Sequence, residues 1–148
     1  MRTPFAVLLL WSLAVGCAAG RADLAEVNRS LQVFGVALGA AAEPPALADV
    51  PRTEEPCLRG IERTFLSRAL TIGYGHDGAI RKVTTRNPET AVFGIRPGDG
   101  ADSSRFKALA AGFRATTDPH RYIRDCCALT LLVDDRSRVF GIAIELRD

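Results

Sequence analysis

The sequence VFGVALG at residues 33–39 returns as VFGIRPG at residues 92–98, which is an offset of 59 residues. The same offset aligns other positions without a gap: Asn28 with Asn87, Ala69-Leu70-Thr71-Ile72 with Ala128-Leu129-Thr130-Leu131, Ile80 with Val139, and Val83 with Ile142. A constant offset over most of a chain indicates two copies of one unit. Two copies are too few for an open array, so the pattern predicts one closed domain with repeats at about 28–86 and 87–146.

Each copy of the motif is predicted to be a bend between a short β segment and a helical layer. In the second copy, Pro97 fixes φ and Gly98 can adopt the positive φ that a type II turn needs. Asp102 or Ser103 can cap a helix, whose apolar positions at helical spacing are Phe106, Leu109, Ala110 and Phe113. The turn residues assigned to the two copies are Gly35, Gly39, Gly94, Gly98 and Asp99.

Alternating apolar residues after each bend predict one β-hairpin in each repeat. The first runs through 66–74 and 79–85 with a turn at Asp77-Gly78, and the second through 122–133 and 139–146. Two prolines around residues 46–50 leave space for at most one or two helical turns in the first repeat. The expected fold is therefore α+β: an antiparallel sheet of four or more strands, with helices on one face.

Residues 1–20 are predicted to be a signal peptide, because a positive charge precedes an apolar run too short to span a bilayer. Two processing routes are open. Ala14-Val15-Gly16-Cys17 resembles a lipobox and predicts acylation of Cys17, whereas Ala18-Ala19-Gly20 suits ordinary signal peptidase. We expect a lipid-anchored protein on the periplasmic side of the bacterial outer membrane; the alternative is a soluble periplasmic or secreted protein. Residues 21–32 are assigned to a tether and 33–148 to a single domain.

The cysteines fit export to an oxidising compartment. If Cys17 carries lipid, one disulfide is expected between Cys57 and one of the adjacent pair Cys126 and Cys127. Strand alternation would place the pair on opposite faces, with Cys127 among the apolar residues. Cys57–Cys127 is therefore predicted, with Cys57–Cys126 as the alternative and a strained Cys126–Cys127 bridge in third place.

Features that resemble functional motifs have structural interpretations here. Residues 73–78 match GxGxxG, but a strand is predicted to follow where phosphate binding needs a helix N-terminus. Isolated His76 and His120 and the lack of a CxxC or HExxH pattern predict no metal site. A formal net charge of +2 gives no reason to expect a nucleic-acid partner. No catalytic residue and no cofactor are predicted.

The turn pattern G-[IV]-x-x-G-D, behind a lipobox and before helix-covered hairpins, resembles the BamE (SmpA/OmlA) family of small envelope lipoproteins. Duplication of such a unit is similar to the β-lactamase-inhibitor-protein architecture. Gly94, Ile95, Gly98 and Asp99 match the turn, whereas the first repeat has Ala40 where Asp stands in the second. The resemblance implies scaffolding or inhibition through protein–protein contact, and it transfers no catalytic residue.

The expected function is therefore non-catalytic binding of an unidentified envelope protein, with the membrane contacted only through the N-terminal lipid. An antiparallel sheet covered by helices on one face leaves its other face free for a partner. By strand parity that face would include Arg124, Thr130 and Ser67. The alternative is a small ligand-binding protein, or a hydrolytic enzyme that uses Cys126 and His120.

Overall fold

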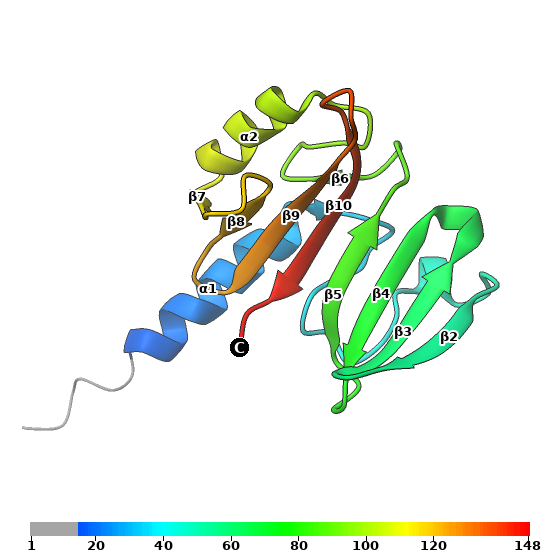
Figure 1. The fold of residues 1–148 in the computed structure, drawn as a ribbon. Helices are drawn as coiled ribbons and strands as arrows, with labels where there is room; N and C mark the ends of the chain where they lie inside the picture. Colours follow the sequence, from blue (N-terminus) through cyan, green and yellow to red (C-terminus); the bar gives the residue numbers. More distant parts are fainter. Residues whose placement is uncertain (1–14) are drawn as a thin grey trace, which may run out of the picture.

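The computed structural model describes the backbone of residues 15–148 and the side chains from Gly20 onward (Figure 1). Most of the predicted signal peptide and the side chain of Cys17 lie outside this part. Among the described residues, no helix is both long and apolar enough to cross a membrane.

The fold is α+β and is dominated by one antiparallel sheet of eight strands in the order β2-β3-β4-β5-β10-β9-β8-β7. Its strands are β2 (Thr53–Cys57), β3 (Gly60–Phe65), β4 (Leu70–Gly75), β5 (Ile80–Thr85), β7 (Arg114–Ala115), β8 (Arg121–Ile123), β9 (Cys127–Val133) and β10 (Val139–Leu146). A second, two-stranded sheet joins β1 (Leu31–Gln32) to β6 (Ala91–Val92). Both predicted hairpins are present, as β4–β5 and β9–β10.

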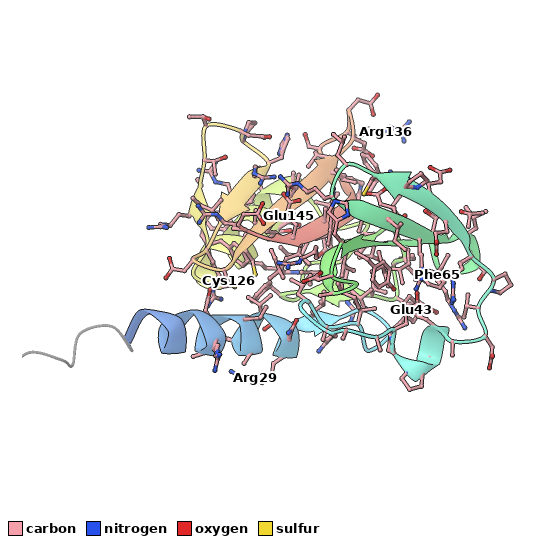
Figure 2. All side chains as sticks on the ribbon, turned by 90° about the horizontal axis from the view of Figure 1, so that it is seen from below. Arg29, Glu43, Phe65, Cys126, Arg136 and Glu145 are labelled. Atoms are coloured by element: carbon pink, nitrogen blue, oxygen red, sulfur yellow. The ribbon has the colours of Figure 1, made fainter. Side chains whose placement is uncertain are left out.

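Within residues 15–148, two α-helices accompany the sheet, α1 (Val15–Arg29) and α2 (Ala101–Ala110), and α1 runs along one side of it (Figure 2). The rest of the helical structure is 3₁₀, at η1 (Pro45–Leu47) and η2 (Leu66–Arg68). Val27 of α1 is fully buried, and the Asn28 side chain exchanges two hydrogen bonds with the backbone of Leu38. Residues 21–29 are thus part of a docked helix, where the sequence led us to expect a tether.

The core lies on the face of the sheet that meets α1 and the segment around residues 30–50. Alternate strand residues supply it, because successive side chains point to opposite faces. Its fully buried strand residues include Phe65, Ile72, Ile80, Leu129, Ile142 and Ile144, and Val33, Leu38, Leu47 and Ile95 meet them from the loops. These residues belong to one contiguous apolar cluster, as a single domain requires.

Several backbone features recur at the 59-residue offset. Phe34 and Phe93 both have positive φ, at 51° and 52°, as do the glycines that follow them. Gly39 N donates to Ile80 O at 2.7 Å, and Gly98 N donates to Val139 O at 2.6 Å. All four glycines assigned to the turns, Gly35, Gly39, Gly94 and Gly98, have positive φ, a conformation that residues with a Cβ rarely adopt.

The strand pairing follows the same offset. β4 pairs with β5 through Ile72 and Val83, and β9 pairs with β10 through the equivalent Leu131 and Ile142. At the centre of the large sheet, Thr84 faces Ala143, which is its own equivalent. In the small sheet Gln32 likewise faces its equivalent Ala91.

Candidate interaction surfaces

The outer face of the large sheet carries small and polar side chains. Thr130 lies on this face, since its neighbours Leu129 and Leu131 point into the core. Strand pairing places it in a row that crosses six strands and consists of Thr64, Thr71, Thr84, Ala143, Thr130 and Arg121. Arg121 reaches across β9 to Glu145 at 2.9 Å. Apart from Ala143, the side chains of this row are polar, as they would also be on an ordinary solvated sheet face.

A hollow of about 990 Å³ opens at one end of this outer face. Its walls are the β2–β3 turn with Leu58, the β4–β5 turn with His76, and the C-terminal residues after β10. Leu58 is fully exposed at its rim. Charged side chains of both signs line the hollow: Arg59, Arg81 and Lys82 with Glu62, Asp77, Glu145 and Asp148. This mixture favours no ligand of one particular charge.

Arg124 does not lie on the outer face, contrary to the strand-parity prediction. β8 ends at Ile123, and the Arg124 side chain is only 12% exposed. Its guanidinium pairs with Asp23 and, at 2.9 Å, with Glu26, both on α1, and donates to Ala111 O at 2.8 Å. Arg124 therefore connects α1 to the rest of the domain from a largely buried position.

Aromatic rings complete the surroundings of Arg124. The guanidinium carbon lies 5.9 Å from the ring centre of Phe93 and 5.6 Å from that of Phe113. The two rings meet edge to face, with centres 5.0 Å apart. A cation over aromatic faces is attracted by their quadrupoles, so the repeated motif contributes to the docking of α1 through Phe93.

Asp23 receives more than the Arg124 ion pair. Burial raises the pKa of its carboxyl, but hydrogen bonds from Cys126 and Arg124 outweigh burial, so the pKa lies below its ordinary value. The Cys126 amide donates to Asp23 Oδ2 at 3.1 Å. The carboxylate is therefore held ionised at neutral pH.

Ser67 lies in η2, at the turn between β3 and β4, and is exposed. Thr130, Arg124 and Ser67 thus occupy three separate places: the outer face, the contact with α1, and a turn. The structure does not bring them together as one surface.

The predicted Cys57 disulfides do not fit the structure. Cys57 is exposed on the edge strand β2, while Cys127 is buried on β9, and β3, β4, β5 and β10 lie between them. Neighbouring strands are ~4.8 Å apart, and Cα atoms more than ~7 Å apart cannot be bridged. Neither Cys127 nor its neighbour Cys126 can reach Cys57 within one chain.

Cys126 and Cys127 also depart from the expected opposite faces, because β9 begins only at Cys127. Their Sγ atoms are 2.7 Å apart. Burial, followed by the hydrogen bond to Asp23, raises the pKa of the Cys126 thiol far above its ordinary value, and burial raises the pKa of the Cys127 thiol. Both sulfurs are therefore protonated and poor nucleophiles at neutral pH.

His120 and Cys126 lie at opposite ends of β8, because His120 O accepts from Leu131 N while Cys126 directly precedes β9. Neither residue lines the hollow described above. From Gly20 onward, no group of three or more His, Cys, Asp or Glu side chains is arranged to hold a metal ion.

The helix α2 presents its large apolar side chains to solvent. The sequence predicted Phe106, Leu109, Ala110 and Phe113 as its buried positions, and only Phe113, which lies beyond the helix, is buried. Phe106 is 73% exposed and Leu109 38% exposed, while Ser104 and Ala108 are fully buried. The helix begins after Gly100 without a side-chain cap, where Asp102 or Ser103 was expected.

A charged cluster that the sequence did not reveal ties the 41–44 segment to the sheet. Glu43 accepts a hydrogen bond from the Tyr74 hydroxyl at 2.6 Å and ion-pairs with Arg63 at 2.8 Å and Arg52 at 2.9 Å. Burial raises the pKa of Glu43, but hydrogen bonds from Tyr74 and Arg63 outweigh it and lower the pKa. Burial next to this carboxylate raises the pKa of Tyr74. A single Glu between Ala42 and Pro44 gives no signal of such partners in the sequence.

Comparison with known proteins identifies no relative: no family model, no curated protein and no solved structure matches this chain.

Proposed function

We propose that this protein is a non-catalytic, exported envelope protein that works by binding another protein, and that the binding surface includes Phe106 and Leu109 of α2. The observation that carries the proposal is the inverted polarity of α2. Phe106 and Leu109 stand three residues apart, so they are neighbours on one face of the helix, opposite the buried Ser104 and Ala108. Aromatic residues exposed beside a second large apolar residue are enriched where proteins bind one another.

Site-specific crosslinking in intact cells tests this surface. A photoreactive amino acid at position 106 is expected to crosslink to one discrete protein, while the same amino acid at position 55 is not. Glu55 is exposed on β2, at the opposite edge of the large sheet from β7, the strand that α2 contacts (Figure 1), so it reports on random contacts. Equal crosslinking at the two positions would contradict the proposal.

Removing the apolar pair gives a second measurement. The double variant Phe106→Ser, Leu109→Ser is expected to recover at least tenfold less of the same protein than the original chain does when each is affinity-purified from detergent-solubilised cells. Its free energy of unfolding should stay within about 0.5 kcal/mol of the original, as is usual for exposed positions. Denaturant unfolding of the variant checks this control, and unchanged recovery would count against the surface.

A lipid anchor at Cys17 belongs to the same proposal. Mass spectrometry of the N-terminal peptide from protein extracted with detergent is expected to find residue 17 first and diacylated or triacylated. A free amine at residue 21, with Cys17 gone, would instead support soluble export through the alternative cleavage site.

We further propose that the two halves arose by duplication of one unit. The supporting observations are the repeated φ values at Phe34 and Phe93, the paired hydrogen bonds of Gly39 and Gly98, and the pairing of residues with their own equivalents. The resemblance to the BamE family rests on the turn around Gly94 and Gly98, and it agrees with a scaffolding or inhibitory role.

A second candidate function is small-ligand binding in the hollow on the outer face. Its volume of about 990 Å³ lies in the upper part of the range of ligand pockets, although pockets of that kind are lined mainly by apolar side chains. Glu145→Ala enlarges the hollow and removes the partner of Arg121. If crosslinking from position 106 is unaltered in this variant, binding of the protein partner by α2 does not depend on the hollow.

A further inference from the structure

The adjacent cysteines form a site that the proposed function does not use. The Sγ atoms of Cys126 and Cys127 are 2.7 Å apart, so the fold already holds the two sulfurs in contact. The remaining cysteine within the described part of the chain, Cys57, is four intervening strands away. Among the cysteines whose side chains the structure describes, these two thiols therefore have only each other as partners in an oxidising compartment.

The surroundings give the two sulfurs different accessibility. Cys127 is fully buried in the apolar cluster, while Cys126 is partly exposed beside α1 (Figure 2). The Cys126 amide is fixed on Asp23 Oδ2 at 3.1 Å, and Asp23 in turn is held by Arg124. The first contact with an oxidant must therefore be made by Cys126.

We propose that Cys126 and Cys127 are a modification site at which a vicinal disulfide forms, with a small-molecule disulfide or a dithiol oxidase as oxidant. The disulfide proposal rests on the proposed function only in that export would place the protein in an oxidising compartment. The Cys126 thiolate attacks one sulfur of the oxidant disulfide, giving a mixed disulfide and one thiolate leaving group. The Cys127 sulfur then attacks the Cys126 sulfur and releases the second thiolate. Two cysteines lose two electrons and two protons, and the oxidant becomes two thiols.

The disulfide is compatible with the docking of α1. Asp23 loses the hydrogen bond from the Cys126 thiol but keeps the amide of the same residue and the guanidinium of Arg124. Because burial and Asp23 disfavour the thiolate, the reduced folded protein should oxidise more slowly than the unfolded chain.

Mass mapping of the purified full chain tests the proposal. Protein refolded with reduced and oxidised glutathione is denatured, alkylated without reductant and digested with trypsin. The peptide of residues 125–136 is expected to be unalkylated and two hydrogens lighter than its reduced form, with Cys57 alkylated. Treatment with reductant should add two alkyl groups to that peptide.

Two single variants make the result decisive. Cys57→Ser should leave the two-hydrogen loss unchanged, whereas Cys126→Ser should abolish it and leave Cys127 alkylated after denaturation. Two alkyl groups on peptide 125–136 after refolding under oxidising conditions, or a link from it to Cys57, would overturn the proposal. The mass mapping does not depend on the crosslinking or N-terminal experiments. A failure of the disulfide proposal can therefore be distinguished from a failure of the proposed function.

Discussion

Replacement of Arg124 with Met is expected to lower the free energy of unfolding by about 3–5 kcal/mol, as is usual when one partner of a buried ion pair is removed. The variant keeps an unbranched apolar stem against the Phe93 and Phe113 rings and removes the charge and the hydrogen bonds of the guanidinium. Asp23 would remain largely buried, with a side chain 14% exposed, and would lose its cation. The loss of stability is measured by urea unfolding, followed by far-ultraviolet circular dichroism.

Arg136→Met is the matched control for this change. Arg136 is exposed in the β9–β10 turn, so the same substitution there should alter stability by no more than about 0.5 kcal/mol. A double variant that also changes Asp23 to Asn should recover part of the loss, because it removes the unpaired charge. A loss below about 1 kcal/mol in Arg124→Met would show that the docking of α1 does not depend on the Arg124 ion pairs.

Replacement of Glu43 with Gln is expected to cost about 1.5–3 kcal/mol at neutral pH, the usual range for hydrogen bonds to a charged group. Gln keeps the shape of the side chain but not the charge that Arg63, Arg52 and Tyr74 surround. The two arginines are 26% and 35% exposed and can be hydrated in the variant, so the loss should be smaller than at Arg124.

The effect of Glu43→Gln should depend on pH in a defined direction. The folded-state pKa of Glu43 is lowered, so its carboxylate contributes stability above the unfolded-state pKa of about 4.3, and this contribution disappears as the pH falls through the folded-state value. Unfolding measured between pH 7 and pH 3 should show the original protein and the variant converging at the acid end. A difference in stability that is constant over this range would contradict the assignment.

The sequence contained enough information to predict the two central hairpins but not the β2–β3 hairpin. Buried and partly exposed residues alternate along β4 because one of its faces is buried, whereas all five residues of β2 are exposed. A strand without a buried face has no periodicity to detect. The threonines and prolines around residues 51–56 are equally compatible with a loop.

The predictions that failed share a cause, which is that one-dimensional spacing does not give the neighbours of a side chain. Phe106 and Leu109 have the spacing of a buried helical face, but the sheet meets α2 on Ser104 and Ala108. Strand parity was extended to Arg124 and Cys126, although β8 ends before the first residue and β9 begins after the second. Outside a ladder of hydrogen bonds, the period of two no longer applies.

The pairing of Thr84 with Ala143 and of Gln32 with Ala91 has a consequence for how such a chain could have begun. Two identical antiparallel strands bring a residue opposite its own counterpart only across a rotation axis, as in the self-complementary interface of a symmetric homodimer. In this protein such an axis would pass between Thr84 and Ala143 in the large sheet and between Gln32 and Ala91 in the small one. One half alone would expose the open edge of β5 or β10, and edges of this kind are templates for further pairing. The duplication proposed above therefore implies an ancestor of one unit that was complete only as two subunits.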